Sequence, residues 1–87
     1  MKLLIRLTNV RVLAGHRVLL AFDDGSEGDV DLAPHLRGPV FQPLLDDRAL
    51  FEAAYVDREL RTLAWPNGAD MDPDVLHNLA HRVQAPK

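Results

Sequence analysis

The sequence contains no cysteine, a single serine and only two lysines. Without cysteine there can be no disulfide, no thiol nucleophile and no zinc site with thiolate ligands. The only serine, Ser26, stands in a turn-like segment with no histidine nearby in the sequence, which argues against an activated serine nucleophile. No enzyme signature and no cofactor-binding pattern remains, so we expect a protein that is not an enzyme and holds no cofactor.

Long apolar runs are missing as well. No segment approaches the roughly 18 apolar residues of a membrane span, and no succession of charged, apolar and small residues marks a signal peptide. The 87 residues are 47% hydrophobic and 26% charged, which is ordinary for a globular protein. Together these features predict a single domain over residues 1–87, located in the cytoplasm and without membrane partners.

Positive charge is sparse. The net charge is −3, and the eight arginines and two lysines are scattered along the chain. Because binding to phosphates relies on clustered lysine and arginine, we expect nucleic acid to be an unlikely partner through direct broad contact. Aspartate outnumbers glutamate ten to three, and most aspartates stand where turns and helix caps are expected.

The first third of the chain predicts a three-stranded meander. In residues 3–13 the apolar residues first occupy odd and then even positions, as a bulge near Thr8 and Asn9 would produce. A turn at residues 14–16 leads to residues 17–22, which are apolar on both faces and therefore predict a central strand.

The next turn, Asp23-Asp24-Gly25-Ser26, is a strong hairpin signal. A two-residue loop would place Phe22 opposite Glu27. A loop of odd length, with Gly25 in the left-handed region, instead places the apolar residues of both strands on one face. Burial of those residues favours the odd loop.

The second half predicts short elements. Three prolines between residues 33 and 43 exclude long regular structure, although a short helical turn is possible. Asp46 or Asp47 is expected to cap a short helix through Glu52, followed by strands at residues 54–56 and 62–65. The expected fold is therefore α+β: a small antiparallel sheet of about five strands, made of a three-stranded meander and a C-terminal hairpin, with short helices and one C-terminal helix.

That last helix has the clearest signals. Asp72 is a good N-cap, Pro73 suits the first helical position, and Asp74 favours the positive end of the helix dipole. The helix should bury one apolar stripe, which comprises Val75, Leu76, Leu79, Ala80 and Val83.

The segment from Trp65 to Asp72 joins the last predicted strand to this helix. Trp65 could be a stacking platform or an interface anchor, although a core position is the more common role of a tryptophan beside a small sheet. Asn67, Gly68 and Asp70 are, with Trp65, the candidates for contact with a ligand or partner. Their other role is to turn the chain.

Two metal sites were considered. The alternate aspartates that begin at Asp70 resemble a calcium loop, but valine stands where its glycine and histidine where its bidentate glutamate should be. Asp74, His77 and His81 share one helical face at the spacing of a zinc or iron site. That face is expected to lie opposite the apolar stripe and to be solvated, so no metal site is expected there.

Three segments resemble the bacterial family called domain of unknown function 2442: FDDGSEGDVDLAPHL, PVFQPLLDDRALFEAAYVD and WPNGADMDPDVLH. The resemblance runs from about residue 3 to residue 79 and implies a small α+β fold with no established activity. It also implies that some relatives are fused to a helix-turn-helix domain, for which this chain leaves no room, while others pair with small partners like toxins and antitoxins. Names from molybdenum-cofactor nucleotide transfer do not fit, because the glycine-rich nucleotide loop is missing.

Three functions follow as hypotheses. The first is a non-catalytic protein-interaction or regulatory module that binds a small protein partner, with an antitoxin-like protein as one form of it. The second is a small-ligand module that uses the loop Trp65–Asp70. The third, the weakest, is a metal-dependent activity through Asp74, His77 and His81. An unpaired edge strand would also permit a homodimer.

Overall fold

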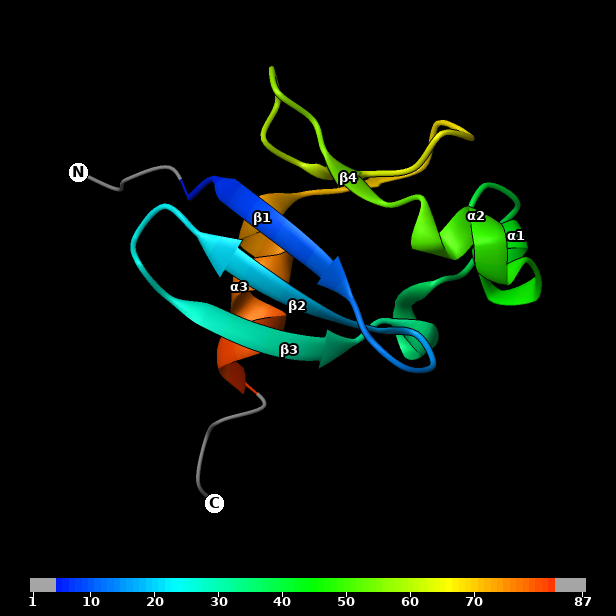
Figure 1. Cartoon of the computed structure of the whole chain (residues 1–87), viewed down its shortest axis with the longest axis horizontal. Coiled ribbons are helices and arrows are strands. Elements are labelled where there is room, and N and C mark those ends of the chain that lie inside the picture. The colour runs from blue at the N-terminus through cyan, green and yellow to red at the C-terminus, as the bar shows by residue number, and fades with distance from the viewer. Residues whose placement is uncertain (1–4, 83–87) are drawn as a thin grey trace.

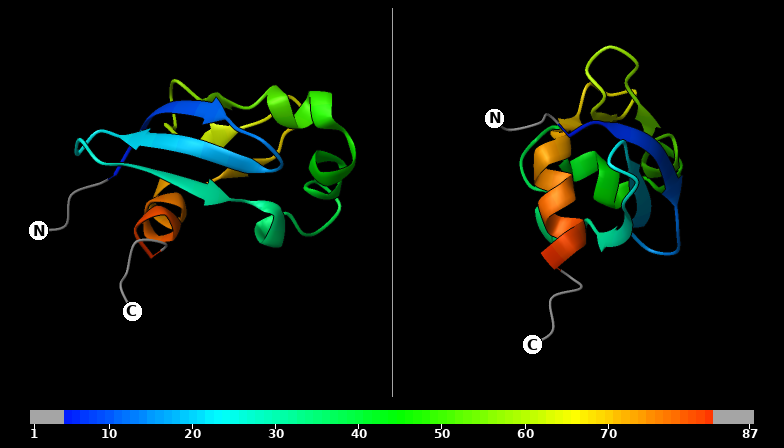
Figure 2. Two further views of the ribbon diagram at one scale, coloured as in Figure 1. Left: turned by 60° about the horizontal axis from the view of Figure 1, so that its bottom comes forward. Right: turned by 90° about the vertical axis from the view of Figure 1, so that its left-hand side faces the viewer.

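The computed structural model describes residues 5–82, and the side chains of residues 5–80. It is an α+β fold with two three-stranded antiparallel sheets. The C-terminal helix covers one face of the first sheet, and the second sheet lies beside β1 (Figures 1 and 2). The elements are β1 (Leu7–Val12), β2 (Arg17–Phe22), β3 (Glu27–Asp31), η1 (Ala33–His35), α1 (Gln42–Asp46), α2 (Arg48–Glu52), β4 (Tyr55–Val56), β5 (Leu63–Ala64), β6 (Asp70–Met71) and α3 (Pro73–Arg82).

The first sheet confirms the predicted meander. Its strand order is β1-β2-β3, so β2 is central, as its apolar residues on both faces predicted. Leu7 pairs with Phe22 and Asn9 pairs with Ala21, so one extra residue of β1 lies between these pairs. This is the bulge predicted from the change of apolar phase, and it keeps the apolar residues on both sides of it over the core.

The β2–β3 turn confirms the odd loop. The Phe22 N–H donates to the Ser26 carbonyl at 3.0 Å, and the Gly25 N–H donates to the Phe22 carbonyl at 3.1 Å. Gly25 has φ of 87°, in the left-handed region. Leu20 pairs with Gly28, and both are buried, so the predicted register is correct.

The second sheet has one strand more than expected. The predicted strands at 54–56 and 62–65 appear as β4 and β5, but β6 then pairs with β5 through Leu63–Met71 and Ala64–Asp70. The stretch after Trp65 is therefore a hairpin followed by a helix. A strand of only two residues, Asp70 and Met71, is too short to show an alternating pattern, which is why the sequence predicted a plain joint here.

The helices begin at predicted caps. The Asp47 carboxylate accepts a hydrogen bond from the Leu50 N–H at 3.2 Å and starts α2. The Asp72 carboxylate accepts one from the Asp74 N–H at 2.9 Å, ahead of Pro73. The short helical turn that the proline-containing segment 33–43 permits is the 3₁₀ helix η1, and helix α1 begins at the end of that segment with Pro43 in its first turn. None of the helices in residues 5–82 is long and apolar enough to cross a membrane.

The core lies between the first sheet, α3 and the second sheet. Its largest fully buried side chains are Trp65, Phe51, Leu7, Leu20, Leu32, Leu36, Leu44, Leu63, Leu76 and Val18. Gly28 marks the closest approach of α3 to the sheet, because a Cβ atom there would lie 2.9 Å from the Cβ of Ala80. Helix and strand can therefore meet only because position 28 has no side chain.

The buried stripe of α3 differs in part from the prediction. Leu76 and Ala80 are buried, but Val75 is 48% exposed, and Val83 lies outside the described residues. His77, expected on a solvated face, instead packs edge-on against Phe22 with ring centroids 4.9 Å apart. The face of α3 that carries His77 thus lies against the β2–β3 hairpin. Helical periodicity does not reveal this tertiary contact.

Candidate functional site: the cleft beside the β4–β5 loop

The structure places Trp65 inside the core. Its side chain is 1% exposed, and its indole N–H donates to the Phe51 carbonyl at 3.1 Å. The ring centroids of Trp65 and Phe51 lie 6.1 Å apart. An indole that is buried and hydrogen-bonded cannot serve as a surface platform, so of the two roles considered for Trp65 the geometry favours the core anchor.

Asn67 and Gly68 build the β5–β6 turn. The Asn67 side-chain oxygen accepts from the Ala69 N–H at 3.1 Å, and its amide donates to the Val40 carbonyl at 2.9 Å. Gly68 has φ of 94°. Both polar ends of Asn67 are therefore engaged in holding the turn and attaching it to the segment before α1, and the geometry gives no support to a ligand loop here.

Of the three residues of the metal hypothesis, the structure describes the side chains of Asp74 and His77. No group of three or more His, Cys, Asp or Glu residues that could hold a metal occurs in the described part of the chain. The His77 Nε2 atom lies 2.9 Å from the Asp24 carboxylate, across the helix–hairpin contact. The side chain of His81 lies outside the described residues. His77 therefore serves packing between α3 and the β2–β3 turn.

Asp24 is the centre of that contact. Its carboxylate accepts hydrogen bonds from the Ser26 hydroxyl at 2.6 Å and the Ser26 N–H at 2.9 Å. These bonds, and then His77, hold the pKa of Asp24 well below its usual range. The carboxylate therefore stays ionised in moderate acid and continues to accept these bonds.

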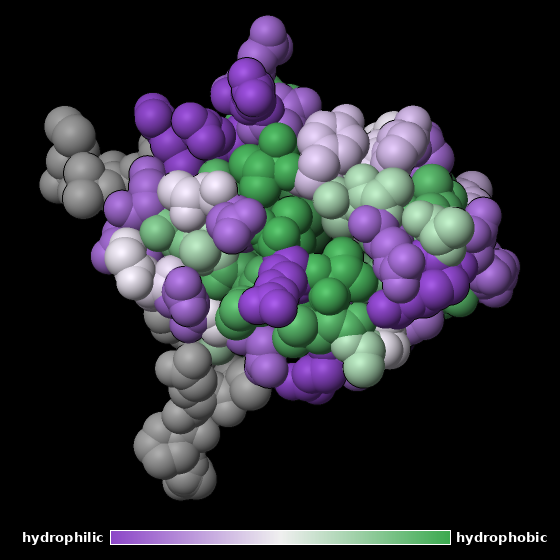
Figure 3. Space-filling view, in the orientation of Figure 1, coloured by the Kyte–Doolittle hydropathy of each residue, from purple (hydrophilic) through white to green (hydrophobic). Residues whose placement is uncertain are grey.

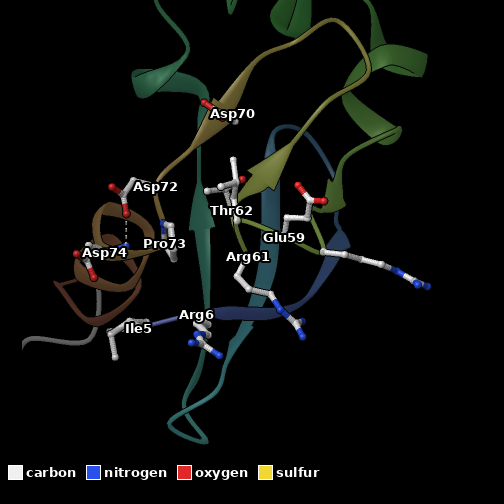
Figure 4. Close-up of a pocket in the computed structure, with 11 residues that line it drawn as sticks. Ile5, Arg6, Glu59, Arg61, Thr62, Asp70, Asp72, Pro73 and Asp74 are labelled. Atoms are coloured by element: carbon white, nitrogen blue, oxygen red, sulfur yellow. Dashed lines mark hydrogen bonds between the residues drawn. The ribbon is translucent and has the colours of Figure 1, made fainter. Parts of the chain in front are cut away.

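Of the four loop candidates, Asp70 alone opens onto a cleft. The cleft has a volume of about 730 Å³ and lies between the β4–β5 loop, the segment leading into β1 and the beginning of α3 (Figure 4). Its lining residues are Ile5, Arg6, Arg58, Glu59, Leu60, Arg61, Thr62, Asp70, Asp72, Pro73 and Asp74.

Cations gather on one side of this cleft. Arg58 and Arg61 come from the β4–β5 loop, and Arg6 precedes β1. All three are exposed, and within residues 5–80 their guanidinium groups make no hydrogen bond or ion pair. In contrast, the guanidinium of Arg17 is paired with Asp29, and that of Arg48 with Glu52. The three cleft arginines thus keep their full hydrogen-bonding capacity for a bound group.

Carboxylates lie on the other side. Asp70 stands on β6, and Asp72 and Asp74 stand at the beginning of α3, across the cleft from Arg6 and Arg61 (Figure 4). Glu59, on the same loop as Arg58 and Arg61, adds one carboxylate to the arginine side. That side is therefore mainly cationic and the other side is anionic, with Ile5 and Pro73 between them.

The β4–β5 loop, residues 57–62, is held in one conformation by hydrogen bonds of its backbone groups. The Asp57 carboxylate accepts from the N–H groups of Glu59 and Leu60, both at 2.9 Å. The Arg61 N–H donates to the Asp57 carbonyl at 2.8 Å, and the Leu7 N–H donates to the Arg61 carbonyl at 3.2 Å. The loop is thus a fixed support that is anchored to β1.

Two features of this loop oppose stability. Leu60 is 63% exposed, the most exposed of the large hydrophobic residues described. Arg61 has φ of 57°, and it is the one described non-glycine residue at positive φ. A side chain in the left-handed region costs about 1–2 kcal/mol, and glycine avoids this cost. Neither signal can be read from the sequence, where residues 57–61 form only a charged turn.

Fold and surface together define a small α+β domain with a charged cleft. The model of the protein family of unknown function DUF2442 matches residues 7–82. The chain therefore belongs to this family, as the resemblance of its motifs predicted. No curated protein matches the sequence.

A solved structure has the same fold: that of a putative DNA binding protein from Nitrosomonas europaea. The two superpose with a TM-score of 0.79 at 23% sequence identity. The match covers 92% of this chain and 51% of that one, so the present chain spans about half of that protein's length. At this identity the likeness establishes the fold alone.

This comparison contradicts the expectation that nucleic acid is an unlikely partner, because a protein with this fold is described as DNA binding. The expectation relied on net charge and on the spacing of arginines along the sequence. Net charge does not reveal local charge, and the fold brings Arg6, Arg58 and Arg61 to one cleft.

Proposed function

We propose that this chain is a non-catalytic, single-domain interaction module of the cytoplasm that binds and regulates a small protein partner, in the manner of an antitoxin. The cleft beside the β4–β5 loop is the observation that carries the proposal. It combines arginines without partners in the described structure, an exposed leucine and an opposing carboxylate wall. Exposed arginine and leucine side chains on a fixed loop are typical of a recognition surface.

Figure 3 supports this assignment to a surface for macromolecules. Hydrophilic side chains gather around the β4–β5 loop at the top of this face, and an apolar area lies below them over β1 and β2. The open face of the first sheet carries the half-buried Leu19 and Ala21. Apolar surface that adjoins a charged rim is what a protein partner covers.

Purification of the tagged chain from its native host, followed by native mass spectrometry, tests the proposal. A protein that co-purifies in a fixed stoichiometric ratio and cross-links to the β4–β5 loop supports it. Recovery of the chain alone, or with only a small molecule bound, contradicts it. The variant Arg37→Ala, which removes an exposed arginine outside both the cleft and the first sheet, is the control and should capture the same partner.

Nucleic acid is a second candidate partner. The three cleft arginines favour it, as does the likeness in fold to the putative DNA binding protein from Nitrosomonas europaea. If the arginines contact three phosphates of duplex DNA, the logarithm of the binding constant should fall with the logarithm of salt concentration with a slope of about −2.7. Fluorescence anisotropy with labelled duplex DNA measures this slope, and an absence of binding at low salt rejects the candidate.

A further inference from the structure

We infer that the cleft accepts an acidic, leucine-containing segment of a protein partner, which is recognised by Arg58, Arg61 and Arg6 together with Leu60. This inference rests on the proposed function and specifies the site and the chemistry of the partner. None of these four residues was a candidate for binding in the sequence.

The conformation of Arg61 carries the first part of the argument. Three turns between paired strands of this chain place glycine at their left-handed positions: Gly15, Gly25 and Gly68. In the β4–β5 loop the left-handed position holds an arginine. Its guanidinium makes no hydrogen bond or ion pair in the described structure, so it does not offset the cost of this conformation within the chain. Backbone strain that no interaction within the chain offsets is common at binding sites, where the strained conformation holds a side chain in position for a ligand.

The rigidity of the loop carries the second part. Asp57 fixes the middle of the loop through two backbone N–H groups, and Leu7 anchors its end. Arg58, Leu60 and Arg61 are therefore presented on a support that is already ordered before binding. A loop that is already ordered loses less conformational entropy when a partner binds to it.

Charge complementarity selects the occupant. Arginines favour carboxylates, which they can bind through paired hydrogen bonds. Leu60, 63% exposed between two arginines, requires an apolar side chain on the partner. The carboxylates of Asp70, Asp72 and Asp74 on the other wall favour a basic end to the same segment. A peptide can offer all three kinds of group in order, whereas a nucleic acid offers uniform negative charge along its backbone.

The test uses a labelled synthetic peptide with glutamates and leucines in its first half and lysines in its second half. Fluorescence anisotropy should show saturable binding to the wild-type chain. Arg61→Gly should weaken this binding by roughly tenfold, because a charge-assisted hydrogen bond is lost. Thermal melting of the same variant should show a midpoint equal to or above that of the wild type, which separates loss of the site from unfolding.

Two further variants keep the test decisive. Arg61→Asn keeps a residue that tolerates the left-handed region and removes the charge, so it should lose affinity like Arg61→Gly. Arg11→Ala removes an exposed arginine outside the cleft and should bind as the wild type does. The inference is overturned if the peptide does not saturate, if Arg61→Gly binds it unchanged, or if labelled duplex DNA binds through Arg61 while the peptide does not.

The two proposals fail separately. If the native partner is captured equally by the wild type and by Arg61→Gly, the chain is an interaction module but this cleft is not its site. If the peptide binds through Arg61 while the native host yields no protein partner, the cleft recognises acidic segments and the proposed function is wrong.

Discussion

Four loops of this small chain contain a residue at positive φ between paired strands, and they differ in the residue that adopts it. The β1–β2, β2–β3 and β5–β6 turns use Gly15, Gly25 and Gly68, while the β4–β5 loop uses Arg61. The three glycine turns are tied to the rest of the structure: Arg48 donates to the Gly15 carbonyl, Asp24 bonds to α3 through His77, and Asn67 bonds to the Val40 carbonyl. The side chain of Arg61 extends into an open cleft. Glycine is present where the turn is attached to other elements, and an arginine at a costly φ is present where the loop lines the open cleft.

The largest effect should come from the anchor of the β5–β6 turn. Trp65→Ala removes a side chain that is 1% exposed and should lower the free energy of unfolding by about 3–5 kcal/mol. In a domain of this size such a loss threatens folding itself. Urea denaturation measures it. Trp65→Phe, which keeps an aromatic ring but loses the bond to Phe51, should lose much less. If Trp65→Ala is nearly neutral, the turn is not a structural joint.

The next largest loss of stability should come from the tightly packed contact between the meander and α3. Gly28→Ala places a methyl group 2.9 Å from the Cβ of Ala80 and should cost about 1–3 kcal/mol through overpacking. Leu60→Ala in the β4–β5 loop changes a residue that is 63% exposed and should be close to neutral. Equal losses in the two variants, measured by urea denaturation, would contradict the contrast between packed meander and open loop.

The glycine turns themselves give a smaller effect. Gly25→Ala and Gly68→Ala should each lose about 1–2 kcal/mol, because alanine is strained at φ of 87° and 94°. No atom would clash with the added methyl group, so the loss reports conformation alone. Gly25→Asn and Gly68→Asn should lose less, because asparagine enters the left-handed region more easily. Neutral alanine variants would show that the positive φ carries no cost here.

A pH titration tests the attachment of the β2–β3 turn to α3. Because Ser26 and His77 lower the folded-state pKa of Asp24, its contribution to stability is fully present above the unfolded-state pKa of about 4. The contribution is lost as the pH falls below that value. The difference in urea midpoint between the wild type and Asp24→Ala should therefore be steady from pH 7 to pH 5 and shrink below pH 4. A difference that grows in acid would contradict this.

The elements that the sequence could predict have local signals, whereas those it could not predict depend on contacts between distant segments. The meander was predictable because alternation, the bulge and the odd β2–β3 turn are local patterns that determine which side chains are buried together. The caps at Asp47 and Asp72 are local as well. Strand β6 was missed because its two residues, Asp70 and Met71, are too few to show alternation.

The cleft could not be predicted because it depends on contacts between distant segments. Arg6 and Arg61 are far apart in the sequence and meet only because Leu7 bonds to the end of the β4–β5 loop. The contact of His77 with Asp24 spans 53 positions and turns a face expected to be solvated toward the hairpin. Of the candidate binding residues, Asp70 lines the cleft, whereas Trp65 and Asn67 are used in folding.

The most direct test of the central claim is the free energy of unfolding of Arg61→Gly, measured in urea beside Gly25→Arg. If Arg61 is retained in spite of its conformation, Arg61→Gly should be as stable as the wild type or up to about 1 kcal/mol more stable, since relief of strain opposes the greater freedom of unfolded glycine. Gly25→Arg should lose about 1–2 kcal/mol, the cost of the same conformation without a ligand to bind. A loss of more than about 1 kcal/mol in Arg61→Gly would show that the arginine stabilises the fold, and would contradict the assignment of this loop to recognition.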